Sequence, residues 1–271
     1  MYQFDKRGVN MSLEMKQIKL YENENQLVSA AVDKMVVEII NKREDNSKAQ
    51  TLVLTGCSPL SGTTSMSISL GIAMANCQKR TLLVDCDVRK ALKYKKLNEE
   101  TTKGLANYLL DFDGNEVSIE NVVYGTNIDN LSYVPCGVYS ENSTRILCSD
   151  RMDNFIEKMK EEYECIIFDL PSVSIVPDSQ VLFRKADGIV LISALGETRK
   201  KQIKEAKLKV KPYIDKYYGM IINKIPLDVY RQNVKDYDYY FVDEKGEQNL
   251  NGAYKKYQQR VKKDGGKKSE A

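Results

Sequence analysis

The sequence predicts a doubly wound α/β fold, in which helices cover both faces of a mainly parallel sheet. Short apolar runs rich in β-branched residues alternate with helical patterns, and few hairpin signals lie between them. This order is typical of βαβ units, whose parallel strands are covered on both faces. With 271 residues and 42% hydrophobic composition, the chain is long enough for one such domain with extensions.

The first expected element is an amphipathic helix near residues 26–42, where Leu27, Ala31, Met35 and Ile39 recur at four-residue spacing. A charged linker follows at residues 41–50. Strands are expected near residues 51–55, 81–85, 131–134, 164–169, 188–193 and 218–223. Helices are expected near residues 63–78, 150–162, 178–186 and 198–210. Pro212 is expected to end the last helix, because a proline inside a helix removes a donor and clashes with the preceding turn.

The two ends of the chain differ in composition from this α/β domain, which we place at residues 26–225. Residues 1–25 are polar and unpatterned, and are expected to form a flexible N-terminal arm. Residues 226–271 hold many tyrosines and lysines but few aliphatic residues. Such a segment cannot bury a core of its own, so we expect a disordered C-terminal tail.

The composition excludes several kinds of site. The 41 basic and 38 acidic residues give a net charge of +3, which does not favour nucleic acid as a partner. Histidine is absent, which removes serine–histidine and cysteine–histidine pairs and histidine-based metal sites. Six cysteines lack C-x-x-C spacing, as reduced core thiols do. With no signal peptide pattern and no 18-residue apolar run, a cytoplasmic location is expected.

Residues 52–65 run from an apolar strand through a turn of small residues into a helix, as a phosphate-binding loop does. The pattern G-x-x-x-x-G-K-[ST] holds phosphates with backbone N–H groups, a lysine and a hydroxyl that reaches Mg²⁺. Gly62 fits the last glycine and Thr64 fits the hydroxyl, but Cys57 stands at the first glycine and Thr63 at the lysine. Taken alone, this spacing favours an ordinary strand–turn–helix connection.

Aspartates end two of the expected strands. Asp85 and Asp87 come just after the strand at 81–85, and Asp169 ends the strand at 164–169. Open parallel sheets bind ligands at this edge. If both strands flank the first, the three carboxylates converge on the Thr64 hydroxyl and form an oxygen-rich site that suits Mg²⁺. One such aspartate is often a helix cap, but three beside a glycine turn favour a metal–nucleotide site.

Residues 82–90, which read LLVDCDVRK, resemble the second Walker motif L-L-I-D-A-D-L-R-R-P of the bacterial tyrosine kinases. These are P-loop enzymes of capsular and exopolysaccharide biosynthesis. Five further segments are similar to family motifs: 104–109 to G-L-S-N-x-L, 147–152 to L-L-x-S-x-x-M, 166–171 to I-I-I-D-T-P, 186–191 to A-D-G-V-L-L and 219–224 to G-V-V-L-N-K. The segments occur in the family's order and spacing and cover about residues 50–225. The tyrosine-rich tail is also similar in kind.

The resemblance implies a P-loop NTPase fold that uses ATP or ADP with Mg²⁺ for protein-tyrosine phosphorylation. Asp85, Asp87 and Asp169 would handle Mg²⁺ and phosphoryl transfer, and Thr64 would be a further Mg²⁺ ligand. The nucleotide would be bound by Ser61, Gly62, Thr63, Thr64, Ser65 and Asn223, of which Asn223 would face the adenine. The tail phosphoacceptors would be Tyr230, Tyr237, Tyr239, Tyr240, Tyr254 and Tyr257, modified by a neighbouring subunit of a homo-oligomer. A membrane-bound regulator of polysaccharide chain length would activate the protein at the inner face of the membrane.

The chain departs from the family pattern where the outer phosphates bind. Leu60 replaces a glycine and Thr63 replaces the lysine of P-G-x-G-K-[ST]-T. Losing one charge-assisted contact typically costs about 1.5–3 kcal/mol in binding, and losing a preorganised transition-state donor costs about 10²–10³ in rate. In the stretch similar to P-N-P-x-E-L-L, Asn142 is kept but Ser143 and Arg145 are not the family residues. We therefore expect a nucleotide-binding regulator with impaired catalysis.

Two alternatives stay open from the sequence. In the first, the chain is an active tyrosine autokinase, and Arg89, Lys90 or a cation of a partner takes the place of the lysine. Against phosphorylation between subunits, the helix at 26–42 lacks the family's ring-assembly motif E-x-x-R-x-x-R. In the second, the chain is a partition-type ATPase, which is disfavoured because no lysine lies between Thr51 and Gln78.

Overall fold

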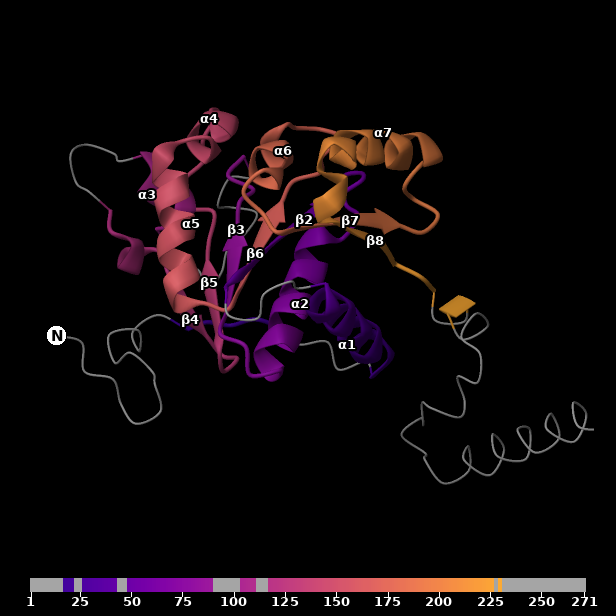
Figure 1. Cartoon of the computed structure of the whole chain (residues 1–271), viewed down its shortest axis with the longest axis horizontal. Helices are drawn as coiled ribbons and strands as arrows, with labels where there is room; N and C mark the ends of the chain where they lie inside the picture. Colours follow the sequence, from indigo (N-terminus) through magenta and orange to yellow (C-terminus); the bar gives the residue numbers. More distant parts are fainter. Residues whose placement is uncertain are drawn as a thin grey trace, which may run out of the picture. The chain divides into compact units, whose positions relative to one another are not determined.

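A computed structural model describes residues 17–21, 26–42, 48–89, 103–110, 117–226 and 229–230. In these residues, eight strands form one sheet in the order β1-β4-β5-β3-β6-β2-β7-β8 (Figure 1). Every neighbouring pair of strands is parallel except β4 and β5. The doubly wound, mainly parallel fold expected from the sequence is confirmed. Among the described residues, those at 17–21 and 28–224 belong to one compact unit, which contains the sheet, and those at 26–27, 225–226 and 229–230 belong to a second.

The strands are β1 (Gln17–Ile18), β2 (Gln50–Gly56), β3 (Thr81–Asp85), β4 (Tyr124–Thr126), β5 (Leu131–Val134), β6 (Cys165–Leu170), β7 (Gly188–Ala194) and β8 (Tyr217–Asn223). The α-helices are α1 (Gln26–Asn41), α2 (Thr63–Asn76), α3 (Leu105–Leu110), α4 (Ser143–Leu147), α5 (Asp150–Glu162), α6 (Asp178–Phe183) and α7 (Lys200–Val210). Two 3₁₀ helices are η4 (Ile119–Asn121) and η5 (Lys211–Lys216).

All six expected strands and all five expected helices are present, and the largest difference is that α6 ends three residues early, at Phe183. The expected N-terminal arm contains one strand that the sequence did not predict. This is β1, which pairs with β4, and the nearby Ile18 and Leu20 are buried. A two-residue strand leaves no periodic pattern, so only its long-range pairing reveals it. Residues 1–16 and 22–25 of the arm and residues 227–228 and 231–271 of the tail lie outside the described residues.

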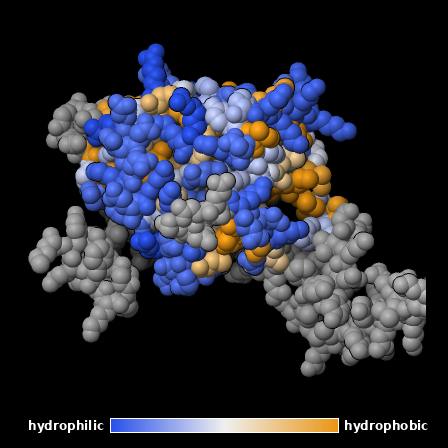
Figure 2. All heavy atoms as spheres, in the orientation of Figure 1, coloured by the Kyte–Doolittle hydropathy of each residue, from blue (hydrophilic) through white to orange (hydrophobic). Residues whose placement is uncertain are grey.

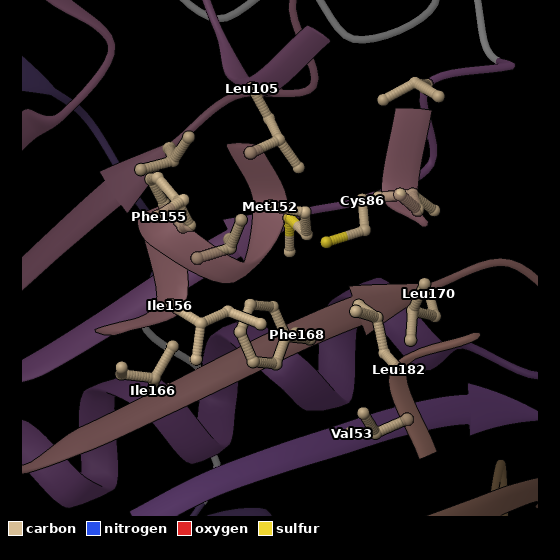
Figure 3. Close-up of a cluster of buried hydrophobic side chains, with 14 of the residues drawn as sticks. Val53, Cys86, Leu105, Met152, Phe155, Ile156, Ile166, Phe168, Leu170 and Leu182 are labelled. Atoms are coloured by element: carbon tan, nitrogen blue, oxygen red, sulfur yellow. The ribbon is translucent and has the colours of Figure 1, made fainter. Parts of the chain in front are cut away.

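The core has two layers, one on each face of the sheet. On one face, strand residues pack against α3, α4, α5, α6 and α7. On the other face they pack against α1 and α2, which lie next to each other in Figure 1. Strand β6 serves both layers, because successive side chains of a strand point to opposite faces. Its Ile166, Phe168 and Leu170 join the first layer (Figure 3), whereas Ile167 joins the second.

Local sequence explains where the long helices form and end. In α5, the four buried residues are Met152, Phe155, Ile156 and Met159, at the 3- and 4-residue spacing of one helix face. Helix α7 ends at Val210 and continues into η5, which has Pro212 in its first turn, as expected for that proline.

All six cysteines lie in the described ranges, and none forms a disulfide bond. Within those ranges, no helix combines the length and the apolar character that crossing a bilayer requires.

Candidate nucleotide-binding site

The turn between β2 and α2 needs a glycine at position 62. Gly62 precedes the helix with a φ of 82°, in the left-handed region, and its carbonyl accepts the first helical hydrogen bond from the Met66 N–H. A Cβ at this position would lie only 2.3 Å from Nδ2 of Asn223. Both the backbone conformation and the available space therefore exclude a side chain here.

Leu60 has the backbone conformation of a glycine, although it is a leucine. Its φ is 60°, and its side chain is 85% exposed. The left-handed region costs a non-glycine residue roughly 1–2 kcal/mol, and this exposed side chain gains little from burial. The loop thus keeps a left-handed backbone at a position where the family pattern has glycine.

Hydroxyl groups hold the loop from inside and from neighbouring elements. The Ser61 hydroxyl donates to the Ser58 carbonyl at 2.6 Å. The Ser58 hydroxyl lies 2.8 Å from that of Thr198, which also accepts the Ala194 N–H at 2.9 Å. From β8, Nδ2 of Asn223 donates to the Ser61 carbonyl at 3.0 Å. The side chains of Thr198 and Asn223 therefore fix the loop against the ends of β7 and β8.

The start of α2 presents backbone donors suited to an anion. The N–H groups of Thr63, Thr64 and Ser65 precede the first residue that can bond within the helix. Among the residues that the structure describes, none accepts a hydrogen bond from them. Free N–H groups at a helix N-terminus form a binding site for phosphate. The loop therefore fits the phosphates of a nucleotide.

Thr63, at the position of the missing lysine, is directed into the loop. Its Oγ1 lies 3.0 Å from the place that a Cβ on Gly56 would occupy. The threonine side chain is short and neutral, so it brings a hydroxyl but no positive charge to this position.

Strand alternation places two of the three predicted carboxylates on the same face as α2. Asp85 and Asp169 lie directly opposite each other on the adjacent strands β3 and β6. Each lies two residues after a strand residue, Leu83 or Ile167, that packs against α1 and α2, and side chains two residues apart in a strand point to the same face. Both carboxylates are buried, and the Ser67 hydroxyl of α2 donates to Asp169 at 3.1 Å. Thr64 is one helical turn before Ser67, at the same end of the sheet.

Asp85 also accepts hydrogen bonds from the segment after β3 and from β5. The Asp87 N–H donates to its Oδ1 at 3.0 Å, and the Tyr133 hydroxyl donates to its Oδ2 at 3.5 Å. Burial raises the pKa of Tyr133 well above its usual value, and the negative charges of Asp85 and Asp169 raise it further. Tyr133 therefore stays protonated and can act as a donor to Asp85.

This set of oxygen donors fits Mg²⁺. Mg²⁺ is usually held by one or two carboxylates together with waters and nucleotide phosphates. Asp85 and Asp169 would supply the carboxylates, and the hydroxyl of Thr64 would supply a further oxygen ligand. Within the described ranges, no three acidic or cysteine side chains are grouped closely enough to hold a metal ion without such additional ligands.

Two nearby cations are engaged in ion pairs away from the loop. The Arg89 Nε lies 3.1 Å from Oδ2 of Asp178, and the Lys224 Nζ lies 2.7 Å from Oε2 of Glu197. Arg89, one of the candidate substitutes in the alternative of an active kinase, is thus directed to Asp178. Lys90, the other, lies outside the described residues.

Asp178 is the centre of a buried cluster. Besides Arg89, it accepts hydrogen bonds from the hydroxyls of Ser143 at 2.6 Å and Thr144 at 2.5 Å. Burial favours its neutral form, but the hydrogen bonds from Arg89, Ser143 and Thr144 together outweigh burial and lower the pKa of Asp178. The cluster joins the segment after β3 to the first turns of α4 and α6.

The sequence interpretation missed Ser67, Tyr133, Thr198 and Asp178. Ser67 and Tyr133 could have been found from strand and helix periodicity once the strand order was known. The remaining predicted residues are the tyrosines, of which Tyr237, Tyr239, Tyr240, Tyr254 and Tyr257 lie outside the described residues. Tyr230 belongs to the second unit, where its N–H donates to the Pro226 carbonyl at 2.9 Å.

Comparison with known proteins identifies relatives of this chain and structures with the same fold. The family described as AAA domain matches residues 60–198, about half of the chain. Tyrosine-protein kinase CpsD of Streptococcus pneumoniae is 30% identical over 196 residues, which cover 72% of this chain and 84% of that protein. Putative tyrosine-protein kinase EpsB of Ralstonia nicotianae is 29% identical over 187 residues, which cover 66% of this chain and 23% of that protein. The crystal structure of the chimerical protein CapA2B2 has the same fold, with a TM-score of 0.68 at 21% identity over 79% of this chain and 96% of that chain.

Proposed function

Because the chain belongs to the bacterial tyrosine-kinase family, with its P-loop domain, we propose that it binds ATP or ADP with Mg²⁺ but transfers phosphoryl groups slowly or not at all. In this proposal it regulates capsular or exopolysaccharide biosynthesis as a nucleotide-dependent adaptor. The observation that carries the proposal is Thr63, a short neutral side chain directed into the loop where the family pattern has lysine.

Nucleotide binding is supported by the groups that remain. The N–H groups at the start of α2 would hold the phosphates, and Asn223 would keep the loop closed against β8. Asp85, Asp169 and Thr64 would hold Mg²⁺. When bound there, Mg²⁺ would neutralise part of the charge of the nucleotide phosphates. Asp87 would take part in the same site through its hydrogen bond to Asp85.

Impaired transfer follows from the charge that is missing. Phosphoryl transfer is almost entirely positioning and charge stabilisation. Removing one preorganised donor to the transition state costs about 10²–10³ in rate. Neither Arg89 nor Lys224 compensates in the described structure, because both are paired with carboxylates elsewhere.

We extend the proposal to the membrane partner of this chain and to its oligomeric state. The family resemblance implies an activating membrane protein of the polysaccharide chain-length regulator type, which would hold the chain at the inner face of the membrane. Helix α1 contains no arginine, so the ring motif E-x-x-R-x-x-R has no counterpart there. We therefore propose that this chain works through its partner, without the family's ring.

The binding half of the proposal is tested by titrating the full-length protein with fluorescent ATP and ADP, with and without Mg²⁺. We expect saturable binding that Mg²⁺ strengthens, and a weaker effect of Mg²⁺ in Asp169→Asn. Asp153→Asn, at an exposed carboxylate of α5, is the control for the charge change. Absence of binding to either nucleotide would contradict the proposal and leave a structural adaptor.

A further inference from the structure

The segment that forms α7 and η5 is much more basic than the rest of the chain. Between residues 199 and 216 there are eight basic and two acidic side chains, a net charge of +6. The whole chain has a net charge of only +3. The remainder of the protein is therefore slightly acidic, and the positive charge is concentrated on one element.

Most of this charge lies on one face of the helix, which we call the basic face of α7. It consists of Lys200, Lys201, Lys204, Lys207 and Lys211, all exposed. Ala206 and Val210 are buried on the opposite side of the helix, against the sheet. Lys209 and Lys216 are excluded, because their ammonium groups donate to the carbonyls of Val173 and Arg184.

Aliphatic side chains are exposed within and beside these lysines. Leu208 is 57% exposed, and it lies four residues after Lys204 and three before Lys211, on the same helix face. Ile214 of η5 is 66% exposed. Figure 2 shows mainly hydrophilic surface with smaller hydrophobic areas beside it at the upper right, where α7 lies in Figure 1. One exposed leucine is ordinary, but two aliphatic side chains beside five lysines form an amphipathic surface.

We propose that the basic face of α7 binds the surface of an anionic lipid membrane directly. The lysine ammonium groups contact lipid phosphates, and Leu208 and Ile214 enter the boundary between headgroups and acyl chains. Clusters of lysines are attracted to anionic membrane surfaces, and lysine stems can lie along apolar surface while their ammonium groups stay in water. This contact is separate from the one through a membrane partner, because the chain makes it itself.

The composition of the face favours lipid over nucleic acid or an acidic protein. Its cations are all lysines, which bind phosphate as point charges, whereas planar recognition of phosphates and bases uses arginine. Its exposed apolar residues are aliphatic, whereas single-stranded nucleic acid is bound by stacking on aromatic side chains. The only acidic side chain of α7 is Glu205, whose Oε1 lies 3.9 Å from Nζ of Lys201.

The test is sedimentation of the full-length protein with vesicles of phosphatidylcholine, with or without phosphatidylglycerol. We expect binding only to the anionic vesicles, weakened by salt. Replacing Lys201, Lys204 and Lys207 by glutamine should weaken it roughly 100-fold, at about five-fold per lysine. Leu208→Ser, which leaves the charge unchanged, should weaken it about ten-fold.

The matched control replaces three exposed lysines outside α7 and η5, Lys34, Lys103 and Lys158, by glutamine. This control variant has the same net charge as the triple variant of α7, and it should bind the vesicles as strongly as the unchanged protein does. Equal losses in the two triple variants would overturn the proposal, as would an unaffected Leu208→Ser. Loss of binding on replacing Lys262, Lys263, Lys267 and Lys268 alone would assign the contact to the tail instead. Binding to duplex DNA or to an acidic peptide, without binding to the anionic vesicles, would also overturn it.

Discussion

Replacing Asp178 by alanine should destabilise the P-loop domain by about 3 kcal/mol. Breaking a buried ion pair by removing one partner costs about 3–5 kcal/mol. Ser143 is fully buried and loses its acceptor, which adds to the cost, whereas the side chain of Arg89 is 37% exposed and can be rehydrated in part. The lower end of the range is therefore the appropriate figure.

The assay is thermal and urea unfolding of the full-length protein at neutral pH. A loss of 3 kcal/mol corresponds to a fall in Tm of roughly 6–12 °C for a domain of this size. Asp178→Asn keeps the volume and one acceptor oxygen, so its loss should be smaller. The matched control is Asp153→Ala, which removes an exposed carboxylate paired with Lys185 and should cost less than about 1 kcal/mol. Equal losses of unfolding free energy in Asp178→Ala and Asp153→Ala would show that the buried cluster around Asp178 stabilises the domain no more than an exposed ion pair does.

Three further predictions concern the same structure. Leu60→Gly should stabilise the protein by about 0.5–1 kcal/mol in urea unfolding, because the gain from relieving the left-handed conformation exceeds the cost of the added freedom of the unfolded chain. Leu60→Ala should leave the free energy of unfolding nearly unchanged. A lower free energy of unfolding in Leu60→Gly would contradict the assigned conformation. Thr63→Lys should tighten ATP binding about ten-fold or more in the fluorescence titration, and no gain would show that the loop cannot use the charge. Folding lowers the pKa of Asp178, so its carboxylate stabilises the protein at pH values above the pKa of an unfolded aspartate, about 3.9, and this stabilisation is lost as pH falls further. In urea unfolding, the difference in free energy of unfolding between Asp178→Ala and the unchanged protein should therefore shrink in acid. A difference that stays constant with pH would contradict this prediction.

Much of the fold could be predicted because its main strands are continuous apolar runs. Strands β3 and β6 are of this kind; β3 ends at Asp85, and Asp169 is the residue before the end of β6. Their common face also follows from strand periodicity. What the sequence does not contain is the strand order that makes β3 and β6 neighbours and brings Tyr133 of β5 to Asp85.

Two other contacts between distant segments could not be predicted. The pair between Arg89 and Asp178 spans 89 residues, and the contact between Ser58 and Thr198 spans 140. Neither leaves a local pattern. From the sequence, Arg89 was therefore a candidate to replace the lysine at the phosphates. In the structure, its guanidinium group is instead paired with the carboxylate of Asp178. The leucine at position 60 does not itself signal a left-handed conformation, and only the glycine at this place in the family pattern points to it.

We propose that this chain retains a nucleotide site whose phosphoryl transfer is impaired, and mass spectrometry of the purified full-length protein after incubation with ATP and Mg²⁺ measures this transfer. We expect no measurable phosphate on Tyr237, Tyr239 or Tyr240 under conditions in which nucleotide binding is saturated. Phosphate on these tyrosines that appears in the unchanged protein and disappears in Asp85→Ala would contradict it.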